Sequence, residues 1–276
     1  MIVFPNSKIN LGLRILQKRS DGYHNLETIF YPILLNDVLE VVAFKKMPHQ
    51  SSTSFTISGI NIPGSNNNNL CLKAYRILKK DFSRLPPVMI HLHKSIPSGA
   101  GLGGGSSDSA FTLKILNEKF ELDLTNQELM KYAVQLGSDC AFFIINKPCY
   151  ATGRGELLEE IELDLSAYKF VIVNPGIHID TCRAFLNVQP APHGKSLKEI
   201  IHDPIGRWKD SLYNDFENRA FKQFPQIVDI KDKFYVAGAV YASMSGSGST
   251  VYGIFPKKLT LQLSFPTGYF VKELTG

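Results

Sequence analysis

The sequence predicts an α+β protein with two domains. Residues 8–15 alternate strictly, with Ile9, Leu11, Leu13 and Ile15 on one face, and this period of two is typical of a half-buried strand. Later strand-like and helical segments mix without a regular strand–helix repeat, which favours α+β over a doubly wound sheet. At about 150 residues per domain, a chain of 276 residues is long enough for two domains.

The first half contains strands, a turn and a helix. The alternation places Lys8 and Asn10 on the same strand face, and the following residues 20–24 contain Asp-Gly, a strong turn signal. Further strands are predicted over residues 26–44. A helix is predicted to begin at Leu70, because apolar residues recur there at helical spacing.

The next segment places a glycine-rich loop between a strand and a helix. Residues 88–93 are predicted to form the strand, residues 97–107 the loop, and residues from about 107 to 119 the helix. A capping box at Thr125 and Glu128 predicts another helix, which ends at Gly137.

The second half shows the same mixture of elements. Strands are predicted at 170–174, near 234–243 and at 251–255, helices near 182–188 and 214–223, and a second Gly/Ser loop at 245–249. We place the domain boundary between residues 157 and 158, which gives domains of 1–157 and 158–276.

The composition indicates a folded protein and excludes several classes. The chain is 44% hydrophobic and 20% charged, which excludes disorder, and its 21 Gly and 15 Pro exclude collagen. Thirty Lys and Arg against 25 Asp and Glu give a net charge of +5, which suits an anionic small molecule or a nucleic acid. The basic residues are scattered rather than clustered with aromatics, so we expect no nucleic-acid partner.

Cysteine spacing and hydropathy predict a cytoplasmic protein. The four cysteines form no C-x-x-C motif, which indicates free thiols in a reducing compartment. Lys8 and Arg14 interrupt any apolar core of a signal peptide. The longest apolar stretch, residues 140–145, is far shorter than the ~20 residues of a membrane helix.

The loop at 97–107 is the most informative segment. Five of the 21 glycines lie here, and glycine lets a backbone surround an anion with N–H groups. Ser106 and Ser107 can cap the following helix, whose N-terminus adds partial positive charge beside the same anion. Phosphate is therefore the expected ligand, and a glycine loop without a ligand is the alternative.

Two other phosphate motifs fit this loop less well. Gly99, Gly101 and Gly104 satisfy the dinucleotide pattern G-x-G-x-x-G, which leaves an NAD-dependent oxidoreductase as a rival, but residues 94–98 separate them from the strand. A Walker A loop needs Gly-Lys-Ser/Thr, which is absent. Nearby, His91 and His93 share a strand face but have no evident third ligand, so we expect a structural role rather than zinc.

Four segments resemble the GHMP kinases, a family that includes galactokinase, homoserine kinase and mevalonate kinase. Residues 97–107 resemble the family's phosphate loop, residues 7–11 its first motif and residues 244–249 its third motif. Residues 19–24, Arg-Ser-Asp-Gly-Tyr-His, resemble a signature of members that act on a cytidylyl diphosphate sugar alcohol. The matches run in the expected order and cover nearly the whole chain.

The resemblance implies a fold and a reaction. The fold would be the two-domain GHMP kinase fold, with an N-terminal domain like ribosomal protein S5 domain 2, a ferredoxin-like C-terminal domain and an active site in the cleft between them. The reaction would be ATP-dependent phosphorylation of the 2-hydroxyl of 4-diphosphocytidyl-2-C-methyl-D-erythritol, giving the 2-phosphate and ADP in non-mevalonate isoprenoid biosynthesis. Homoserine or mevalonate as acceptor is the alternative, against which the segment Asp21 to His24 argues.

The resemblance also implies catalytic residues. Asp139 would be the general base that takes the hydroxyl proton, and Lys8 would be its charge partner and keep the carboxylate ionised. Without the resemblance, Asp139 would be read as a helix N-cap and Lys8 as a solvated strand lysine.

The binding residues follow in the same way. On the acceptor, Tyr23 would stack on the pyrimidine, His24 would bond its edge and Phe185 would form a second aromatic wall. Asn10 and Thr181 would be further contacts. Core packing is the alternative for Tyr23 and Phe185. The nucleotide would contact Asn69, Lys94, Pro97, Ser98, Gly99, Ala100, Gly101, Leu102, Gly103, Gly104, Gly105, Ser106 and Ser107.

The expected partners are ATP and this small-molecule acceptor. Mg²⁺ is expected with ATP, but no carboxylate cage is evident, so its protein ligands are not assigned. We expect no nucleic acid, no membrane, and a monomer or weak homodimer.

Overall fold

The computed structural model describes residues 1–43, 53–62, 68–186, 188, 190 and 194–276. It divides into two compact units, each built from separate stretches of the chain. Unit 1 consists of residues 1–7, 35–98 and 103–146, and unit 2 of residues 8–34, 99–102 and 147–276. The boundary between residues 157 and 158 stays a prediction, because it divides the linear chain, whereas the units follow spatial proximity.

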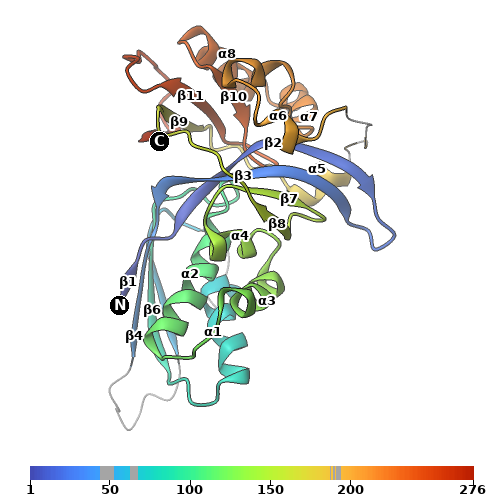
Figure 1. The fold of residues 1–276 in the computed structure, drawn as a ribbon. Coiled ribbons are helices and arrows are strands. Elements are labelled where there is room, and N and C mark those ends of the chain that lie inside the picture. The colour runs from blue at the N-terminus through green and yellow to red at the C-terminus, as the bar shows by residue number, and fades with distance from the viewer. Residues whose placement is uncertain (44–52, 63–67, 187, 189, 191–193) are drawn as a thin grey trace. The chain divides into compact units, whose positions relative to one another are not determined.

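Unit 1 is a four-stranded sheet with helices on one side (Figure 1). The strand order is β1 (Ile2–Val3), β4 (Val38–Ala43), β6 (Val88–Lys94) and β5 (Ser54–Gly59), and only β5 and β6 are parallel. The helices are α1 (Leu70–Asp81), α2 (Gly104–Lys119), α3 (Asn126–Leu136) and α4 (Cys140–Ile145). Both the strand at 88–93 and the helix from Leu70 are confirmed.

Local sequence explains several boundaries in unit 1. In β6, Val88, Ile90 and Leu92 are buried while Met89 and His93 are exposed, so the strand has one core face. The predicted capping box forms at the start of α3, where the side chains of Thr125 and Glu128 each bond the other's backbone N–H. Gly137 ends the same helix, as predicted.

The helix after the glycine-rich loop begins earlier than the sequence predicts. It begins at Gly104, after Gly103 in the left-handed conformation, and has no side-chain cap. The prediction that Ser106 and Ser107 cap this helix is therefore wrong, since both lie inside its first turns. The helix was predicted to begin later because glycine has a low helix propensity, but here the tertiary structure overrides that propensity.

Unit 2 contains two four-stranded sheets (Figure 1). One has the order β2 (Asn6–Lys18), β3 (His24–Asn36), β7 (Cys149–Thr152) and β8 (Leu157–Glu160), and the ends of β2 and β3 belong to unit 1. The other is antiparallel, in the order β10 (Tyr241–Met244), β11 (Val251–Pro256), β9 (Tyr168–Asn174) and β12 (Phe270–Thr275). The helices are α5 (Thr181–Leu186), α6 (Leu197–Ile200), α7 (Glu217–Gln223), α8 (Pro225–Val236) and the 3-10 helix η2 (Ile205–Asp210).

The strand at 8–15 is present but is not half-buried. Every residue of β2 from Asn6 to Ile15 is buried, on both faces. The polar face is buried because its side chains have partners. Arg14, for example, donates to Glu27 Oε1 at 3.1 Å and to the carbonyl oxygens of Lys195 and Ser211 at 2.7 and 3.0 Å. The alternation predicted the strand and its two faces, but not what covers the polar one.

The predicted strand near 234–243 is half wrong. Residues 225–236 form α8, which begins with Pro225 in its first turn, and the strand β10 begins only at Tyr241. Phe234, Tyr235 and Val236 have strand propensity, but Phe234 packs in the core of unit 2 from the helix. This core also includes Val171, Ile230, Met244 and Phe255.

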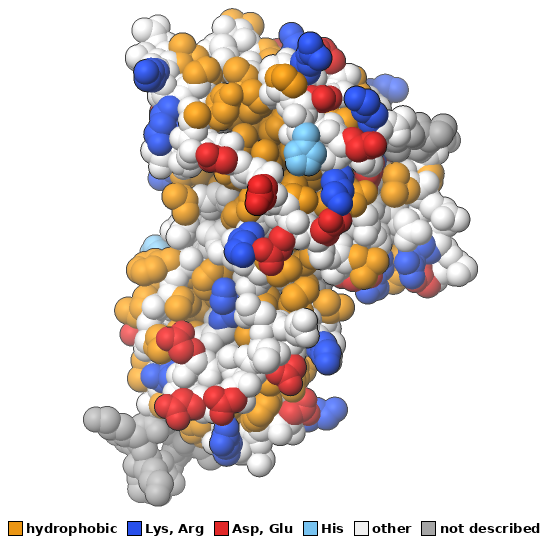
Figure 2. Space-filling view, in the orientation of Figure 1, with side chains coloured by type: hydrophobic (Ala, Val, Ile, Leu, Met, Phe, Trp, Pro, Cys, Tyr) orange, Lys and Arg blue, Asp and Glu red, His pale blue; other side chains and the backbone are white. Residues whose placement is uncertain are grey.

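The charged side chains on the face in Figure 2 are scattered, and the cysteines are free thiols, as the sequence predicts. Figure 2 shows basic and acidic side chains interspersed over the viewed face. All four cysteines are free thiols, of which only Cys182 is exposed. Among the helices in the described ranges, none combines the length and apolarity needed to cross a lipid bilayer.

Candidate active site

Lys8 and Asn10 lie together on the buried polar face of β2. Lys8 Nζ donates to Asn10 Oδ1 at 2.6 Å, and Asn10 Nδ2 donates to Thr28 Oγ1 at 2.9 Å. Thr28 in turn donates to the carbonyl oxygen of Gly12 at 2.6 Å. The Lys8 ammonium also lies 4.8 Å from the centre of the Phe30 ring. The common face predicted for Lys8 and Asn10 is confirmed, and this chain of bonds orders both side chains.

The middle of the glycine-rich loop, residues 99–102, belongs to unit 2 and packs closely on other backbone. A Cβ atom on Gly101 would lie 2.0 Å from the carbonyl oxygen of Ser245, and Gly101 has a φ of +79°. Ser245 Oγ donates to the carbonyl oxygen of Gly101 at 2.8 Å. The Lys8 N–H donates to the carbonyl oxygen of Leu102 at 3.0 Å. This stretch is thus bonded both to β2 and to the second glycine loop.

The end of the same loop forms the first turn of α2 in unit 1. Gly103 has a φ of +71°, which allows the sharp entry into the helix. Ser107 Oγ is buried and has no hydrogen-bond partner within the described part of the chain. A buried hydroxyl without a partner beside an open helix N-terminus suits an anionic oxygen.

Lys94 lies between two buried carboxylates of unit 1. Its ammonium pairs with Asp37 and, at 2.7 Å, with Asp108 Oδ2. All three side chains are at most 3% exposed. Asp37 also accepts the N–H groups of Ser95 and Ile96, at 2.6 and 2.9 Å. These bonds direct the Lys94 side chain inward and hold the junction between β6 and the glycine-rich loop.

Burial and charge act against each other in this triad. Burial is the larger influence on Asp108, and it raises the pKa of that carboxyl to about 7 despite the neighbouring Lys94. Asp108 Oδ1 has no partner among the described residues, which also favours the protonated form. For Lys94, burial opposes the charged form, but Asp108 and Asp37 outweigh it and raise the pKa.

Asn69 and Asp139 both occupy helix N-cap positions. Asn69 Oδ1 accepts the Cys71 N–H at 2.9 Å, so this side chain caps α1. Asp139 stands at the N-cap position of α4, but its side chain makes no capping bond. Asp139 therefore stands at the N-cap position, as predicted, but its carboxylate does not cap the helix.

The aromatic residues predicted to hold the acceptor lie in unit 2. The rings of His24 and Phe185 stack at 5.5 Å with an interplanar angle of 25°. Tyr23 is 56% exposed, and the Arg154 guanidinium lies 4.9 Å from the centre of its ring. Burial, and then the charge of Lys18, lowers the pKa of His24, so its imidazole is neutral at pH 7.

A cavity of about 380 Å³ lies beside α5. Its lining includes His178, Arg183, Phe216, Arg219 and Ser247. Thr181, at the start of α5, shares a hydrogen bond of 2.9 Å with Ser247.

Several predicted residues are thus brought together, within each unit. Unit 2 joins Lys8 with Asn10, residues 99–102 with β2, and His24 with Phe185. Unit 1 contains Asn69, Lys94, Pro97, Ser98, residues 103–107 and Asp139. Asp37 and Asp108 were not predicted from the sequence. No local signal marks them, because they meet Lys94 across 57 and 14 residues.

Within the described part of the chain, protein side chains alone form no metal site. Among the described residues, no three His, Cys, Asp or Glu side chains gather in a way that could bind a metal ion. The imidazole of His91 bonds with Thr56 Oγ1 at 2.8 Å and Ser58 Oγ at 3.0 Å, and His93 bonds with Ser58 at 2.9 Å. These contacts fit the structural role expected for the two histidines.

Family models match two segments of the chain. The model of the GHMP kinases N terminal domain matches residues 69–147, and that of the GHMP kinases C terminal matches residues 196–262.

Named relatives match almost the full length. A protein of Bacteroides fragilis (strain YCH46) named 4-diphosphocytidyl-2-C-methyl-D-erythritol kinase is 50% identical over 99% of this chain and 100% of its own. A protein of Porphyromonas gingivalis with the same name is 41% identical over 98% of this chain and 97% of its own.

Solved structures agree with the family models. The crystal structure of a 4-(cytidine 5'-diphospho)-2C-methyl-D-erythritol kinase matches with a TM-score of 0.79 and 28% identity over 100% of both chains. The mevalonate kinase of Methanococcus jannaschii matches with a TM-score of 0.68 over 94% of this chain and 92% of its own, but at 17% identity, which shows a common fold alone.

Proposed function

The chain belongs to the GHMP kinase family, and on that premise we propose that it transfers the terminal phosphoryl group of ATP to the 2-hydroxyl of 4-diphosphocytidyl-2-C-methyl-D-erythritol. The products are ADP and the 2-phosphate. The observation that carries this proposal is the 50% identity with a relative of that name over 99% of the chain. Mevalonate as acceptor has only the shared fold in its favour.

Asp139 is the general base that takes the proton of the acceptor hydroxyl. Phosphoryl transfer needs a group near the attacking oxygen that takes its proton. The family resemblance assigns this role to Asp139, which stands at the N-cap position of α4. Lys8, whose ammonium is ordered by Asn10, is the charge partner of this base and helps to orient the hydroxyl.

The glycine-rich loop binds the ATP phosphates. The close backbone packing of Gly101 and the unpartnered hydroxyl of Ser107 support this role. Asn69 and Lys94 act near the nucleotide, with Lys94 holding the start of the loop through Asp37. Since protein side chains form no metal cluster in the described ranges, Mg²⁺ would be held largely by the phosphates, with Ser107 Oγ available; it would neutralise their charge.

Recognition of the acceptor belongs to the aromatic residues of unit 2. The exposed ring of Tyr23 offers a stacking face for the pyrimidine, while Arg154 supports the ring. The neutral imidazole of His24 can donate one hydrogen bond and accept one at the base edge. Stacking on Phe185 fixes the orientation of the imidazole ring. Asn10 and Thr181 provide further polar contacts. The enzyme acts on small molecules as a cytoplasmic monomer or weak dimer.

An acceptor panel tests the proposal. ADP release is measured with ATP and, separately, 4-diphosphocytidyl-2-C-methyl-D-erythritol, mevalonate and homoserine. We expect turnover of the cytidylyl substrate only. ADP release with mevalonate or homoserine, and none with the cytidylyl substrate, contradicts the proposal. Binding of NADH but not ATP would revive the oxidoreductase alternative.

A further inference from the structure

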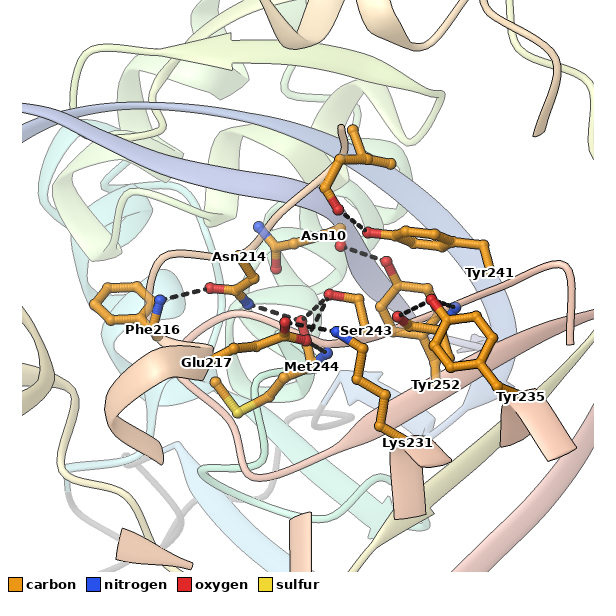
Figure 3. Close-up of polar contacts among 12 residues, drawn as sticks. Asn10, Asn214, Phe216, Glu217, Lys231, Tyr235, Tyr241, Ser243, Met244 and Tyr252 are labelled. Atoms are coloured by element: carbon orange, nitrogen blue, oxygen red, sulfur yellow. Dashed lines mark hydrogen bonds and ion pairs between the residues drawn. The ribbon is translucent and has the colours of Figure 1, made fainter. Parts of the chain in front are cut away.

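Asn214 belongs to a buried polar network in unit 2 (Figure 3). It precedes α7 and is 2% exposed. Its Nδ2 donates to the carbonyl oxygens of Met244 and Gly246, at 2.7 and 2.9 Å. Its Oδ1 accepts the N–H of Phe216 at 3.0 Å. Both amide protons and the amide oxygen are therefore used on backbone groups.

The backbone around Asn214 is attached to β2. The N–H of Leu13 donates to the carbonyl oxygen of Tyr213 at 2.9 Å, and the N–H of Asp215 donates to the carbonyl oxygen of Leu13 at 2.9 Å. Residues 213–215 thus pair with the strand that carries Lys8 and Asn10. Asn214 extends from this strand edge to the end of β10.

The loop that Asn214 holds contacts two proposed parts of the active site. A Cβ on Gly246 would lie 3.3 Å from Gly101 Cα, in the phosphate loop, and 3.5 Å from Asn10 Oδ1. In β11, the strand that follows this loop, Tyr252 Oη donates to the carbonyl oxygen of Asn10 at 2.7 Å. A shift of Gly246 would therefore disturb Gly101 and the Lys8–Asn10 pair together.

We infer that Asn214 is a positioning residue for phosphoryl transfer, which fixes Gly246 against the phosphate loop and against Asn10. The inference rests on the proposed function. Only an amide can fill this place, because both Met244 and Gly246 present acceptors and Phe216 presents a donor. Aspartate has the same shape but would set a carboxylate oxygen against two carbonyl oxygens.

Neighbouring side chains of the network bond to β10 and to the segment before Asn214 rather than to Gly246. Glu217 accepts the N–H of Met244 at 2.8 Å and the hydroxyl of Ser243 at 3.0 Å, and it pairs with Lys231 at 2.7 Å. Tyr241 Oη donates to the carbonyl oxygen of Leu212 at 2.9 Å. Tyr241→Phe is therefore a matched control, which removes a buried hydrogen bond of the same network.

The experiment compares Asn214→Asp, Asn214→Ser and Tyr241→Phe with the wild type. The melting temperature of every variant is measured first. ADP affinity by calorimetry and steady-state kinetics are then measured at a temperature below all of these values. Because small misplacement of reacting groups is costly, we expect kcat to fall ~10–100-fold in the Asn214 variants. In Tyr241→Phe we expect a lower melting temperature with kcat within ~threefold of the wild type.

A kcat within about threefold of the wild type in a folded Asn214 variant overturns the inference. Failure of both Asn214 variants to fold, while Tyr241→Phe folds, overturns it as well, since the role of Asn214 would then be to maintain the fold. If the wild type does not phosphorylate the cytidylyl acceptor, the proposed function fails instead. The variants are then compared on the alcohol of the panel that the wild type does use.

Discussion

The ammonium of Lys8 shows how this chain orders a buried charge. Asn10 accepts from Lys8 and donates to Thr28, and Thr28 donates to Gly12. Each group has a defined partner, so the position of the cation is set before any ligand binds. Such preorganisation lowers the cost of ordering the site during the reaction.

The general-base assignment predicts the effect of Asp139→Asn. The amide keeps the shape of the side chain but cannot take the hydroxyl proton, so kcat should fall by about a hundredfold or more. Affinity for ATP should change little. Steady-state kinetics and nucleotide titration check both parts. Asp229→Asn, an exposed change of the same kind on α8, is the matched control and should be neutral.

A near-normal kcat in Asp139→Asn would remove the general-base role. A loss of ATP affinity as large as the loss of kcat would also contradict it, because the carboxylate would then act in nucleotide binding.

His24 gives the protein a predictable pH dependence. Burial, and then the charge of Lys18, lowers its pKa below the ordinary value of 6.5, so the imidazole is mainly neutral at pH 7 and above and gains its proton as the pH falls through the lowered pKa. The neutral form can accept a hydrogen bond from the base and the protonated form cannot. The KM for the cytidylyl acceptor should therefore be nearly constant between pH 8 and 7 and rise as the pH falls below 6.5.

His24→Gln is the test of this assignment, since glutamine does not titrate and keeps one donor and one acceptor. Its KM for the acceptor should lack the rise on the acid side, measured by kinetics at saturating ATP. An identical acid rise in the variant would assign the titration to another group.

At the scale of elements, the two glycine loops depend on each other's backbone. The φ of +79° at Gly101 and the 2.0 Å distance from its missing Cβ to the Ser245 carbonyl oxygen leave no room for a side chain. This close approach explains the glycine at position 101. It also joins residues 99–102 of the phosphate loop to the end of β10 within unit 2.

Gly101→Ala should separate the two loops. We expect kcat/KM for ATP to fall by about a hundredfold, because the phosphate-binding backbone is displaced. Gly268→Ala is the comparison, because Gly268 lies outside the proposed site: its φ is also positive, at +94°, but an added Cβ would have no described neighbour within 4 Å. Only the left-handed strain of roughly 1–2 kcal/mol should then appear, as a lower melting temperature.

Equal losses of activity in Gly101→Ala and Gly268→Ala, measured on folded protein, would show that strain and not the contact with Ser245 is decisive.

Element boundaries were predictable where local chemistry sets them. The capping box at Thr125 and the alternation in β6 depend on neighbours within a few residues, and both are confirmed. The start of α2 and the helix at 225–236 are set by tertiary packing, which overrides the low helix propensity of glycine and the strand propensity of aromatic residues.

At the scale of the molecule, periodicity and motif order were enough to predict the α+β class and the family. The site was predictable where a motif names the residues, as for Lys8 and Asn10, whose common face follows from a period of two. Asp37, Asp108 and Asn214 were not predictable. Asp108 and Asp37 meet Lys94 across 14 and 57 residues, and Asn214 meets Met244 across 30 residues, so only the folded chain brings these contacts together.

The position of the new phosphate on the acceptor decides whether the enzyme phosphorylates the 2-hydroxyl, as proposed. Carbon 2 of the acceptor carries a methyl group and no hydrogen, so a phosphate on its hydroxyl has no proton three bonds away. After reaction with ATP, the ³¹P spectrum should show one new phosphomonoester singlet per ADP, with the acceptor's diphosphate intact. A proton-coupled multiplet would place the phosphate on another hydroxyl, and inorganic phosphate in place of a monoester would contradict phosphoryl transfer to the acceptor.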